Sequence, residues 1–228
     1  MKASERITVL LAEDHVIVRE GLRKLLDAES DIEVVGEAGT GRQAVNLARE
    51  IHPDVVVMDI AMPHLNGLEA TRQIRQAAPD TRVLVLSAHN DELYVDKVIE
   101  LGAAGYLIKQ TSFRLLAEAI RAVHQGKTFF SPCIAKASEH RHQTTIDRRG
   151  RCRAIDLHLS AREMEVLQRI AEGGANKQIA VDLGISIKTV EKHRDHLMHK
   201  LDIHDTAGLT RYAIAAGIIE CGVDVTIV

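Results

Sequence analysis

One short run limits the fold of this chain more than any other. Four apolar residues, Val55 to Met58, lead directly into Asp59, and turn residues follow at once. Such a run is typical of a strand that is buried on both faces of a parallel sheet. Ligands of open α/β sheets bind at the carboxyl ends of the strands, and a buried carboxylate there is costly unless a partner neutralises it. The run therefore predicts a functional Asp59 at the edge of an α/β sheet.

Strand-like and helix-like segments alternate up to about residue 125, which predicts a doubly wound parallel sheet of five strands with right-handed crossovers. The predicted strands are Ile7–Ala12, Glu33–Glu37, Val55–Asp59, Val83–Ser87 and Gly105–Lys109. Between them lie amphipathic stretches whose apolar stripes we expect to face the sheet. These stripes are Val18, Leu22, Leu25 and Leu26; Ala44, Val45, Ala48 and Ile51; Leu93, Val95, Val98, Ile99 and Leu101; and Leu115, Leu116, Ala119, Ile120 and Val123.

Two further carboxylates, Glu13 and Asp14, end the first predicted strand. They would lie beside Asp59 if the strand order is the flavodoxin-like one, in which the first and third strands are neighbours. Hard oxygen ligands favour Mg²⁺, which keeps several of its waters. We therefore expect Mg²⁺ to be bound by Asp14, Asp59 and a backbone carbonyl such as that of Ala61, with Glu13 acting mostly through water.

The last two predicted strands end in a hydroxyl and an ammonium, Ser87 and Lys109. A compact ammonium suits a phosphoryl oxygen. A carboxylate nucleophile, Mg²⁺, a hydroxyl donor and a lysine together indicate a phosphoryl-transfer site. Each residue alone is weak evidence, but their placement at successive strand ends is hard to explain by chance.

A small all-α module follows, and we divide the chain into residues 1–126, a linker at 127–155 and residues 156–228. Five arginines within the linker could form an arm that contacts phosphates, although a solvated tether explains them better. These arginines are Arg141, Arg148, Arg149, Arg151 and Arg153.

The helical module carries its own start and stop signals. Ser160 and Glu163 form a capping box, and Leu159 and Met164 are spaced as a hydrophobic staple across it. The remaining signals predict a second helix capped by Asn176 and ending at Leu183, a turn at Gly184, a third helix capped by Ser186 and running to about Leu201, and a fourth from about Thr206 to Ala216.

The third of these helices has one apolar and one polar face. Val190, Leu197 and Leu201, with the stem of Arg194, should be buried, and His199 falls on the polar face. The second helix of a helix-turn-helix enters the major groove of DNA, so the polar face would meet bases and phosphates. There Glu191 would accept from cytosine, Lys192 would donate to guanine, and His193 and Arg194 would contact phosphate. The expected DNA-binding residues are Lys188, Thr189, Glu191, Lys192, His193, Arg194 and Asp195.

These motifs together resemble those of a known family. Residues 7 to about 125 resemble the receiver domain of two-component response regulators, and residues 159 to about 220 resemble the LuxR-type helix-turn-helix. Together they resemble the NarL/FixJ class. The residues that carry the resemblance are Glu13-Asp14, Asp59, Met62-Pro63, Gly67, Ser87, Tyr106 and Lys109, followed by Leu159 to Glu163, Asn176 to Ala180, Leu183 to Ser186 and Lys188 to His193.

The resemblance implies that Asp59 is phosphorylated by a sensor histidine kinase. Ser87 would then bind the phosphoryl group, and Tyr106 would turn inward behind it, which shifts the population between two states. It also implies a homodimer on double-stranded promoter DNA. For the fourth helix, a dimerisation surface and the core of the module remain equal alternatives for Leu209, Tyr212, Ala213 and Ala216.

Two positions depart from the common receiver pattern. Gln110 follows Lys109 where many receivers have proline, so we expect a trans peptide bond there. Ala61 is small, which leaves room for a water to attack the acyl phosphate.

Composition excludes some other functions. Aromatic residues make up 3% of the chain and tryptophan is absent, which argues against stacking of single-stranded nucleic acid. Cys133, Cys152 and Cys221 show no metal or redox spacing and are expected to be free thiols. No signal peptide or membrane-spanning run is apparent, so we expect a cytoplasmic protein with no membrane partner.

Two other functions remain open. One is a DNA-binding protein that does not depend on phosphorylation and uses the first module only to dimerise. The other is an aspartyl phosphatase, but such chemistry commonly needs a second aspartate two residues later, where this chain has Ala61. We therefore expect a regulator rather than an enzyme.

Overall fold

The computed structural model describes residues 6–87, 95, 98–110, 112–130, 159–216 and 218–219. The chain divides into two compact units, residues 1–150 and 151–228, which are described separately. Among the described residues, no helix is both long enough and apolar enough to cross a membrane. The five linker arginines, the three cysteines and the apolar tail Val223–Val228 lie outside the described residues.

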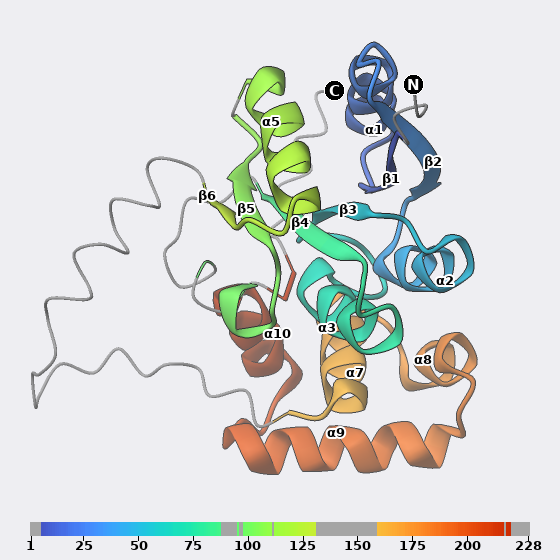
Figure 1. Ribbon diagram of the computed structural model, residues 1–228. Coiled ribbons are helices and arrows are strands. Elements are labelled where there is room, and N and C mark those ends of the chain that lie inside the picture. The colour runs from blue at the N-terminus through green and yellow to red at the C-terminus, as the bar shows by residue number, and fades with distance from the viewer. Residues whose placement is uncertain are drawn as a thin grey trace, which may run out of the picture. The chain divides into compact units, whose positions relative to one another are not determined.

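The first unit is built on a parallel sheet with the strand order β2-β1-β3-β4-β5-β6 (Figure 1). The strands are β1 (Ile7–Ala12), β2 (Ile32–Ala38), β3 (Val55–Asp59), β4 (Arg82–Ser87), β5 (Gly105–Ile108) and β6 (Phe129–Phe130). The predicted flavodoxin-like order is confirmed, because β1 lies between β2 and β3. The carboxyl ends of β1, β3, β4 and β5 therefore meet at one edge.

The prediction of five strands was wrong, because the described sheet has a sixth. The sequence assigned Phe129 and Phe130 to the linker, but they pair with Gly105 and Tyr106 at the edge of the sheet. A strand of two residues is too short to show an alternation of apolar and polar residues, so periodicity could not reveal it.

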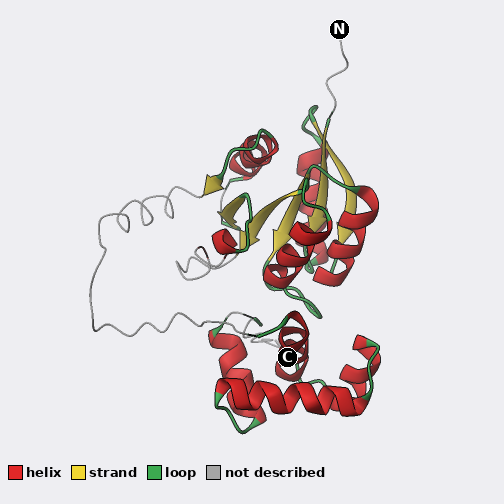
Figure 2. Ribbon diagram, turned by 60° about the horizontal axis from the view of Figure 1, so that its bottom comes forward, coloured by secondary structure: helices red, strands yellow, loops and turns green. Residues whose placement is uncertain are grey.

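Helices cover both faces of the sheet (Figure 2). Buried residues of α1 (Val16–Asp27) and α5 (Phe113–His124) pack on one face, and those of α2 (Gly41–Ile51) and α3 (Gly67–Ala77) pack on the other. The helix α3 was not predicted from the sequence. Its start is marked by Asn66, whose side chain accepts a hydrogen bond from the Glu69 amide. Of the stripe predicted around Leu93–Leu101, Val95 and Val98 are buried and Leu101 packs against the core, but Ile99 is 46% exposed. Leu93 lies outside the described residues.

The apolar stripe predicted for the first helix is only partly buried. Leu26 is fully buried and Leu22 packs against the core, but Val18 is 39% exposed and Leu25 45% exposed. In the second helix, Ile51 is also 36% exposed. In the case of α1 the stripe is narrower than predicted because α1 shares its face of the sheet with α5.

The second unit consists, in the described part, of α7 (Ala161–Ala171), α8 (Asn176–Leu183), α9 (Ile187–Leu201) and α10 (Thr206–Ala215) around a core of its own. The predicted capping box of Ser160 and Glu163 is confirmed, and so is the Ser186 cap of α9. Asn176 is not a cap, because the N-cap of α8 is Ala175. Asn176 lies one position into the helix, and its side chain instead accepts a hydrogen bond from Arg194 at 3.4 Å.

Gly67, the first residue of α3, lies directly against the end of β3. A Cβ atom at this position would lie 1.8 Å from the carbonyl oxygen of Asp59, which no side chain can tolerate. The Gly67 amide also donates to the Ile60 carbonyl at 2.8 Å. The chain between β3 and α3 is thus closed into a tight loop at its base.

Candidate functional site

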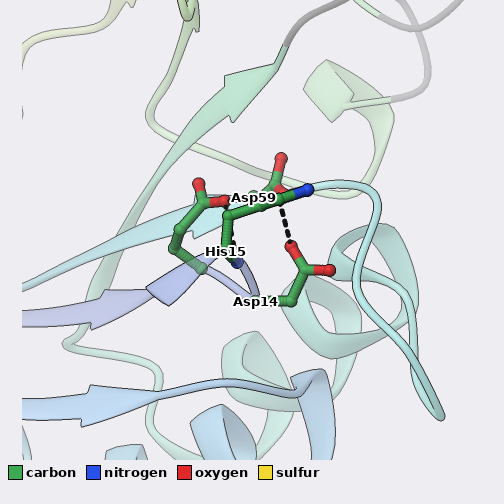
Figure 3. A group of neighbouring side chains, drawn as sticks. Asp14, His15 and Asp59 are labelled. Carbon is green, nitrogen blue, oxygen red and sulfur yellow. Dashed lines mark hydrogen bonds and ion pairs between the residues drawn. The ribbon is translucent and has the colours of Figure 1, made fainter. Parts of the chain in front are cut away.

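The three predicted acidic residues meet at the carboxyl edge of the sheet. Ligand atoms of Glu13, Asp14, His15 and Asp59 all lie within 4.8 Å of one another, and Figure 3 shows Asp14, His15 and Asp59 side by side. Glu13 and Asp59 are each only 2% exposed. Their proximity follows from the pairing of β1 with β3, which aligns Ala12 with Met58.

Lys109 supplies the positive charge at this edge. Its Nζ atom lies 2.9 Å from Asp59 Oδ2 and 2.9 Å from Glu13 Oε2. The Lys109 amide donates to the carbonyl of Ser87 at 2.7 Å, which fixes the loop after β5 against the end of β4. The described residues contain no cis peptide bond, so the bond between Lys109 and Gln110 is trans as predicted.

The charge balance of the site leaves Asp59 under-stabilised as an anion. Burial raises the pKa of Asp59, the negative charge of Glu13 raises it further, and Lys109 only partly offsets both, so that the pKa is raised to about 6. Burial by itself would lower the pKa of Lys109, but attraction to Asp59 and then Glu13 outweighs burial, and the net shift is upward. The site thus lacks positive charge that a bound cation would supply.

The donor set fits a hard divalent cation. Glu13 Oε2 and Asp59 Oδ2 are buried, and each is paired with the same Lys109 ammonium at 2.9 Å. Ala61, whose carbonyl the sequence analysis proposed as a ligand, is half-buried in the loop that follows β3. Carboxylate and carbonyl oxygens are the ligands that Mg²⁺ prefers.

Ser87 and Tyr106, the two predicted switch residues, are both buried. Ser87 ends β4 and is 1% exposed, and Tyr106 on the neighbouring strand β5 is fully buried in the core. Ser87 therefore lies at the same edge as Asp59, whereas Tyr106 lies two residues before the end of β5 with its ring already turned inward.

Two residues of the site, His15 and Arg19, were not predicted from the sequence. His15 follows the acidic pair, and its Nδ1 atom lies 2.9 Å from Asp14 Oδ1 and 3.2 Å from Glu13 Oε1. The charge of Asp14 is the main cause of the raised pKa of His15. Arg19, in α1, donates to the carbonyl of Glu13 at 2.5 Å. The adjacency of His15 to the acidic pair was a usable signal; the contact of Arg19 depends on how α1 packs.

The second candidate site is the polar face of α9. A depression of about 490 Å³ is lined by Ser186, Lys188, Thr189, Glu191, Lys192 and Asp195. The charged members of this set are exposed, and Thr189 is half-buried through its contact with Ser186. Five of the seven predicted DNA-binding residues therefore lie on one surface.

His193 and Arg194, the two other predicted DNA-binding residues, are half-buried. Arg194 donates to Asn176 in α8 and to Thr206 at the start of α10, so its guanidinium already joins three helices. Burial, followed by the charge of Arg162, lowers the pKa of His193. Arg194 therefore holds the module together in this structure, and the phosphate contact expected of it would require its guanidinium to share these partners.

The residues suggested for dimerisation are mostly core residues. Leu209 and Ala213 are fully buried and Ala216 is 8% exposed, all within the core of the helical module itself. Only Tyr212 is half-buried and thus partly accessible. The structure therefore favours the core alternative, because these side chains are covered by the other helices of their own module.

Comparisons with known proteins agree with this architecture. Residues 9–121 match the response regulator receiver domain, and residues 157–213 match the bacterial regulatory proteins of the luxR family. The transcriptional regulatory protein LiaR of Bacillus subtilis is 41% identical over 209 residues, which cover 91% of this chain and 96% of LiaR. DegU of Brevibacillus brevis is 38% identical over 211 residues, covering 88% and 89% of the two chains.

A solved structure of a response regulator also matches nearly the whole chain. The complex of the response regulator RcsB with DNA matches with a TM-score of 0.56 and 28% identity, over 91% of this chain and 98% of that chain. The chain belongs to the two-component response regulators of the NarL/LuxR class, with a receiver domain followed by a LuxR-type helix-turn-helix domain.

Proposed function

We propose that a sensor histidine kinase phosphorylates Asp59 and that this modification controls binding of promoter DNA by the helix-turn-helix domain. The observation that carries the proposal is the position of Lys109, whose Nζ atom lies 2.9 Å from both Asp59 and Glu13. A lysine at this distance is placed to exchange its carboxylate partner for a phosphoryl oxygen. The raised pKa of Asp59, about 6, still leaves the nucleophile mostly ionised at neutral pH.

The chemistry is a phosphoryl transfer to a carboxylate. An Oδ atom of Asp59 attacks the phosphorus of a phosphohistidine, a P–O bond forms, the P–N bond breaks, and the imidazole of the kinase leaves. Lys109 neutralises charge on the phosphoryl group, and the Ser87 hydroxyl donates to one of its oxygens. When bound by Glu13, Asp14, Asp59 and the Ala61 carbonyl, Mg²⁺ would supply further positive charge at the same oxygens.

The DNA-binding surface is the polar face of α9. Lys188, Glu191, Lys192 and Asp195 are exposed together on this face, as is required of a helix that enters a major groove. Two acidic residues on this face weaken non-specific attraction to phosphate and favour selective reading of bases. One module of this size covers few base pairs, so we infer that a phosphorylated homodimer binds two half-sites about one helical turn apart.

The two domains are assigned to residues 1–126 and 156–228, joined by a linker at 127–155 of which Phe129 and Phe130 belong to the sheet. Support for DNA binding comes from the match to RcsB, which was solved in complex with DNA. Support for a regulator rather than an enzyme comes from relatives such as LiaR and DegU, which are named transcriptional regulatory proteins.

The test is a selection of bound sequences from random double-stranded DNA by the full chain, with and without acetyl phosphate and Mg²⁺. We expect an enriched, two-fold symmetric sequence whose recovery increases with the phosphodonor, and no such increase for Asp59→Asn. The variant Lys192→Ala should lose enrichment under both conditions.

Absence of any enriched sequence would overturn the DNA-binding proposal. Equal enrichment with and without the phosphodonor, in a chain that takes up phosphate, would instead show that DNA binding does not depend on phosphorylation.

A further inference from the structure

We propose that Arg19 is a positioning residue of the phosphoacceptor site, which holds the backbone of Glu13 and Asp14 so that their carboxylates face a divalent cation. The inference rests on the proposed function, since it assigns a role within the site that binds the cation and the phosphoryl group. It concerns a side chain of α1 that touches none of the carboxylate oxygens of Glu13, Asp14 or Asp59.

The segment from Glu13 to His15 needs such support because it belongs to neither β1 nor α1. The amide of Glu13 donates to the carbonyl of Ala38 at 2.9 Å, which ties the segment to β2 at one point. Arg19 meets the carbonyl side of the same segment. Its Nη1 atom donates to the Glu13 carbonyl at 2.5 Å and reaches the Asp14 carbonyl at 3.4 Å.

Glu37, on β2, fixes the other side of the guanidinium. The Nε atom of Arg19 donates to Glu37 Oε2 at 3.2 Å, and the Arg19 side chain is only 16% exposed. A planar guanidinium has five donors spread over three nitrogens and can serve acceptors on different sides, whereas the three donors of an ammonium lie on a single atom. The acidic segment is therefore joined through Arg19 to the strand that flanks β1.

Arg19 and Lys109 act on the acidic residues in different ways. Lys109 contacts Oδ2 of Asp59 and Oε2 of Glu13, which are the oxygens that a cation would also contact. Arg19 contacts carbonyl oxygens behind the carboxylates, so its positive charge stabilises the acidic segment without competing for metal-binding atoms. Partners of this kind, which orient ligands from outside the coordination sphere, typically change metal affinity ~10–100-fold when they are removed.

Arg23 is a matched control one turn further along α1. It pairs with the same carboxylate, Glu37, and with Asp27 at 3.5 Å, but makes no contact with the acidic segment among the described residues. Arg19→Gln and Arg23→Gln each remove one positive charge and one ion pair with Glu37. Only the first also removes the donors to Glu13 and Asp14.

The experiment measures the affinity of the full chain for Mn²⁺ by electron paramagnetic resonance, with Mg²⁺ as the competitor. We expect Arg19→Gln to raise the dissociation constant about 10-fold or more and Arg23→Gln to change it less than about 2-fold. Arg19→Lys, which keeps the charge but cannot bridge Glu37 and two carbonyls, should weaken binding by an intermediate factor. Thermal unfolding without metal, followed by circular dichroism, should show similar midpoints for the two glutamine variants.

Equal dissociation constants for Arg19→Gln and Arg23→Gln would overturn the inference, and full recovery by Arg19→Lys would show that charge alone acts. If Arg19→Gln does not fold, Arg19→Lys decides the matter by the same titration. A wild-type chain that binds no Mn²⁺, or that takes up no phosphate from acetyl phosphate, would contradict the proposed function rather than the role of Arg19.

Discussion

Each domain buries a carboxylate beside a lysine, and the pKa values of the two carboxylates are shifted in opposite directions. In the receiver domain, Asp59 lies 2.9 Å from Lys109; in the helix-turn-helix domain, Glu163 lies 2.7 Å from Lys200. Burial and the charge of Glu13 raise the pKa of Asp59 to about 6. Burial acts in the same direction on Glu163, but Lys200 and Ser160 outweigh it and lower its pKa.

The difference lies in the number of hydrogen-bond donors. Glu163 accepts from the amide and the hydroxyl of Ser160 as well as from Lys200, and it closes the capping box of α7. Asp59 accepts from the Ile60 amide at Oδ1, and its Oδ2 is paired with Lys109, whose ammonium is shared with Glu13. A buried carboxylate with a full set of donors stabilises a fold, whereas one with too few is available to a cation or to phosphorus.

The largest effect that tests this comparison is the loss of phosphate uptake. We expect Asp59→Asn to abolish incorporation of phosphate from acetyl phosphate and Mg²⁺, because it removes the nucleophile. The measurement is the intact mass of the chain after incubation. Asp80→Asn, at an exposed position of the same domain, should incorporate phosphate like the wild type. Incorporation by Asp59→Asn equal to that of the wild type would exclude Asp59 as the acceptor.

The second effect is the pH dependence of stability in EDTA. In the folded protein the pKa of Asp59 is about 6, against an ordinary value of 3.8. The contribution of protonated Asp59 to stability is therefore complete below pH 3.8 and is lost as the pH rises through 6. Relative to Asp59→Asn, the wild type should lose on the order of 3 kcal/mol of unfolding free energy between pH 4 and 8. Urea titrations followed by circular dichroism would measure this difference.

Glu163 should respond with the opposite sign, because its pKa is lowered in the folded state. Its contribution is complete above its ordinary pKa of 4.5 and is lost as the pH falls through the lower folded value. A stability advantage of the wild type over Glu163→Gln that shrinks with rising pH would contradict the comparison.

The third effect is the contribution of Glu163 to the helical domain. We expect Glu163→Ala to lower the free energy of local opening of α7 by about 1–3 kcal/mol, because Ser160 and Lys200 lose a buried acceptor. Hydrogen exchange of peptides from residues 161–171 would measure it. The exposed residue Asp195 provides the control, since Asp195→Ala should leave the exchange of these peptides unchanged.

The smallest effect is the stabilisation by Mg²⁺. At ten times its dissociation constant, Mg²⁺ should stabilise the receiver domain by about 1.4 kcal/mol, and EDTA should reverse this change. Hydrogen exchange should slow in peptides that contain Glu13, Asp14 and Asp59. If slowing occurred in α7 and not in these peptides, the acidic cluster would not be the metal site.

The sequence revealed those features that local patterns specify. Asp59, Ser87 and Lys109 each follow an apolar run that reads as a strand. They were predicted to lie at one edge of the sheet because parallel strands bring their carboxyl ends together. The capping box of Ser160 and Glu163 was equally readable, since its two residues are three positions apart.

What the sequence could not reveal depends on tertiary packing. The bridge from Arg19 to the carbonyl of Glu13 requires α1 to begin immediately after the acidic segment and to lie beside β2. The exposure of Leu25 depends on the sharing of a sheet face with α5, which no pattern within α1 records. The same limit applies to α10, where only the packed structure separates a core residue such as Leu209 from an accessible one such as Tyr212.

The contact between Gly67 and Asp59 has a mechanical consequence. Since backbone touches backbone there, the phosphoacceptor and the first turn of α3 behave as one rigid piece, with no deformable side chain between them. Any change in the backbone of Asp59 is therefore passed directly to α3 rather than absorbed along residues 60–66. Alanine in place of this glycine would drive the strand end and the helix apart, and the carboxylate would leave the position at which Lys109 meets it.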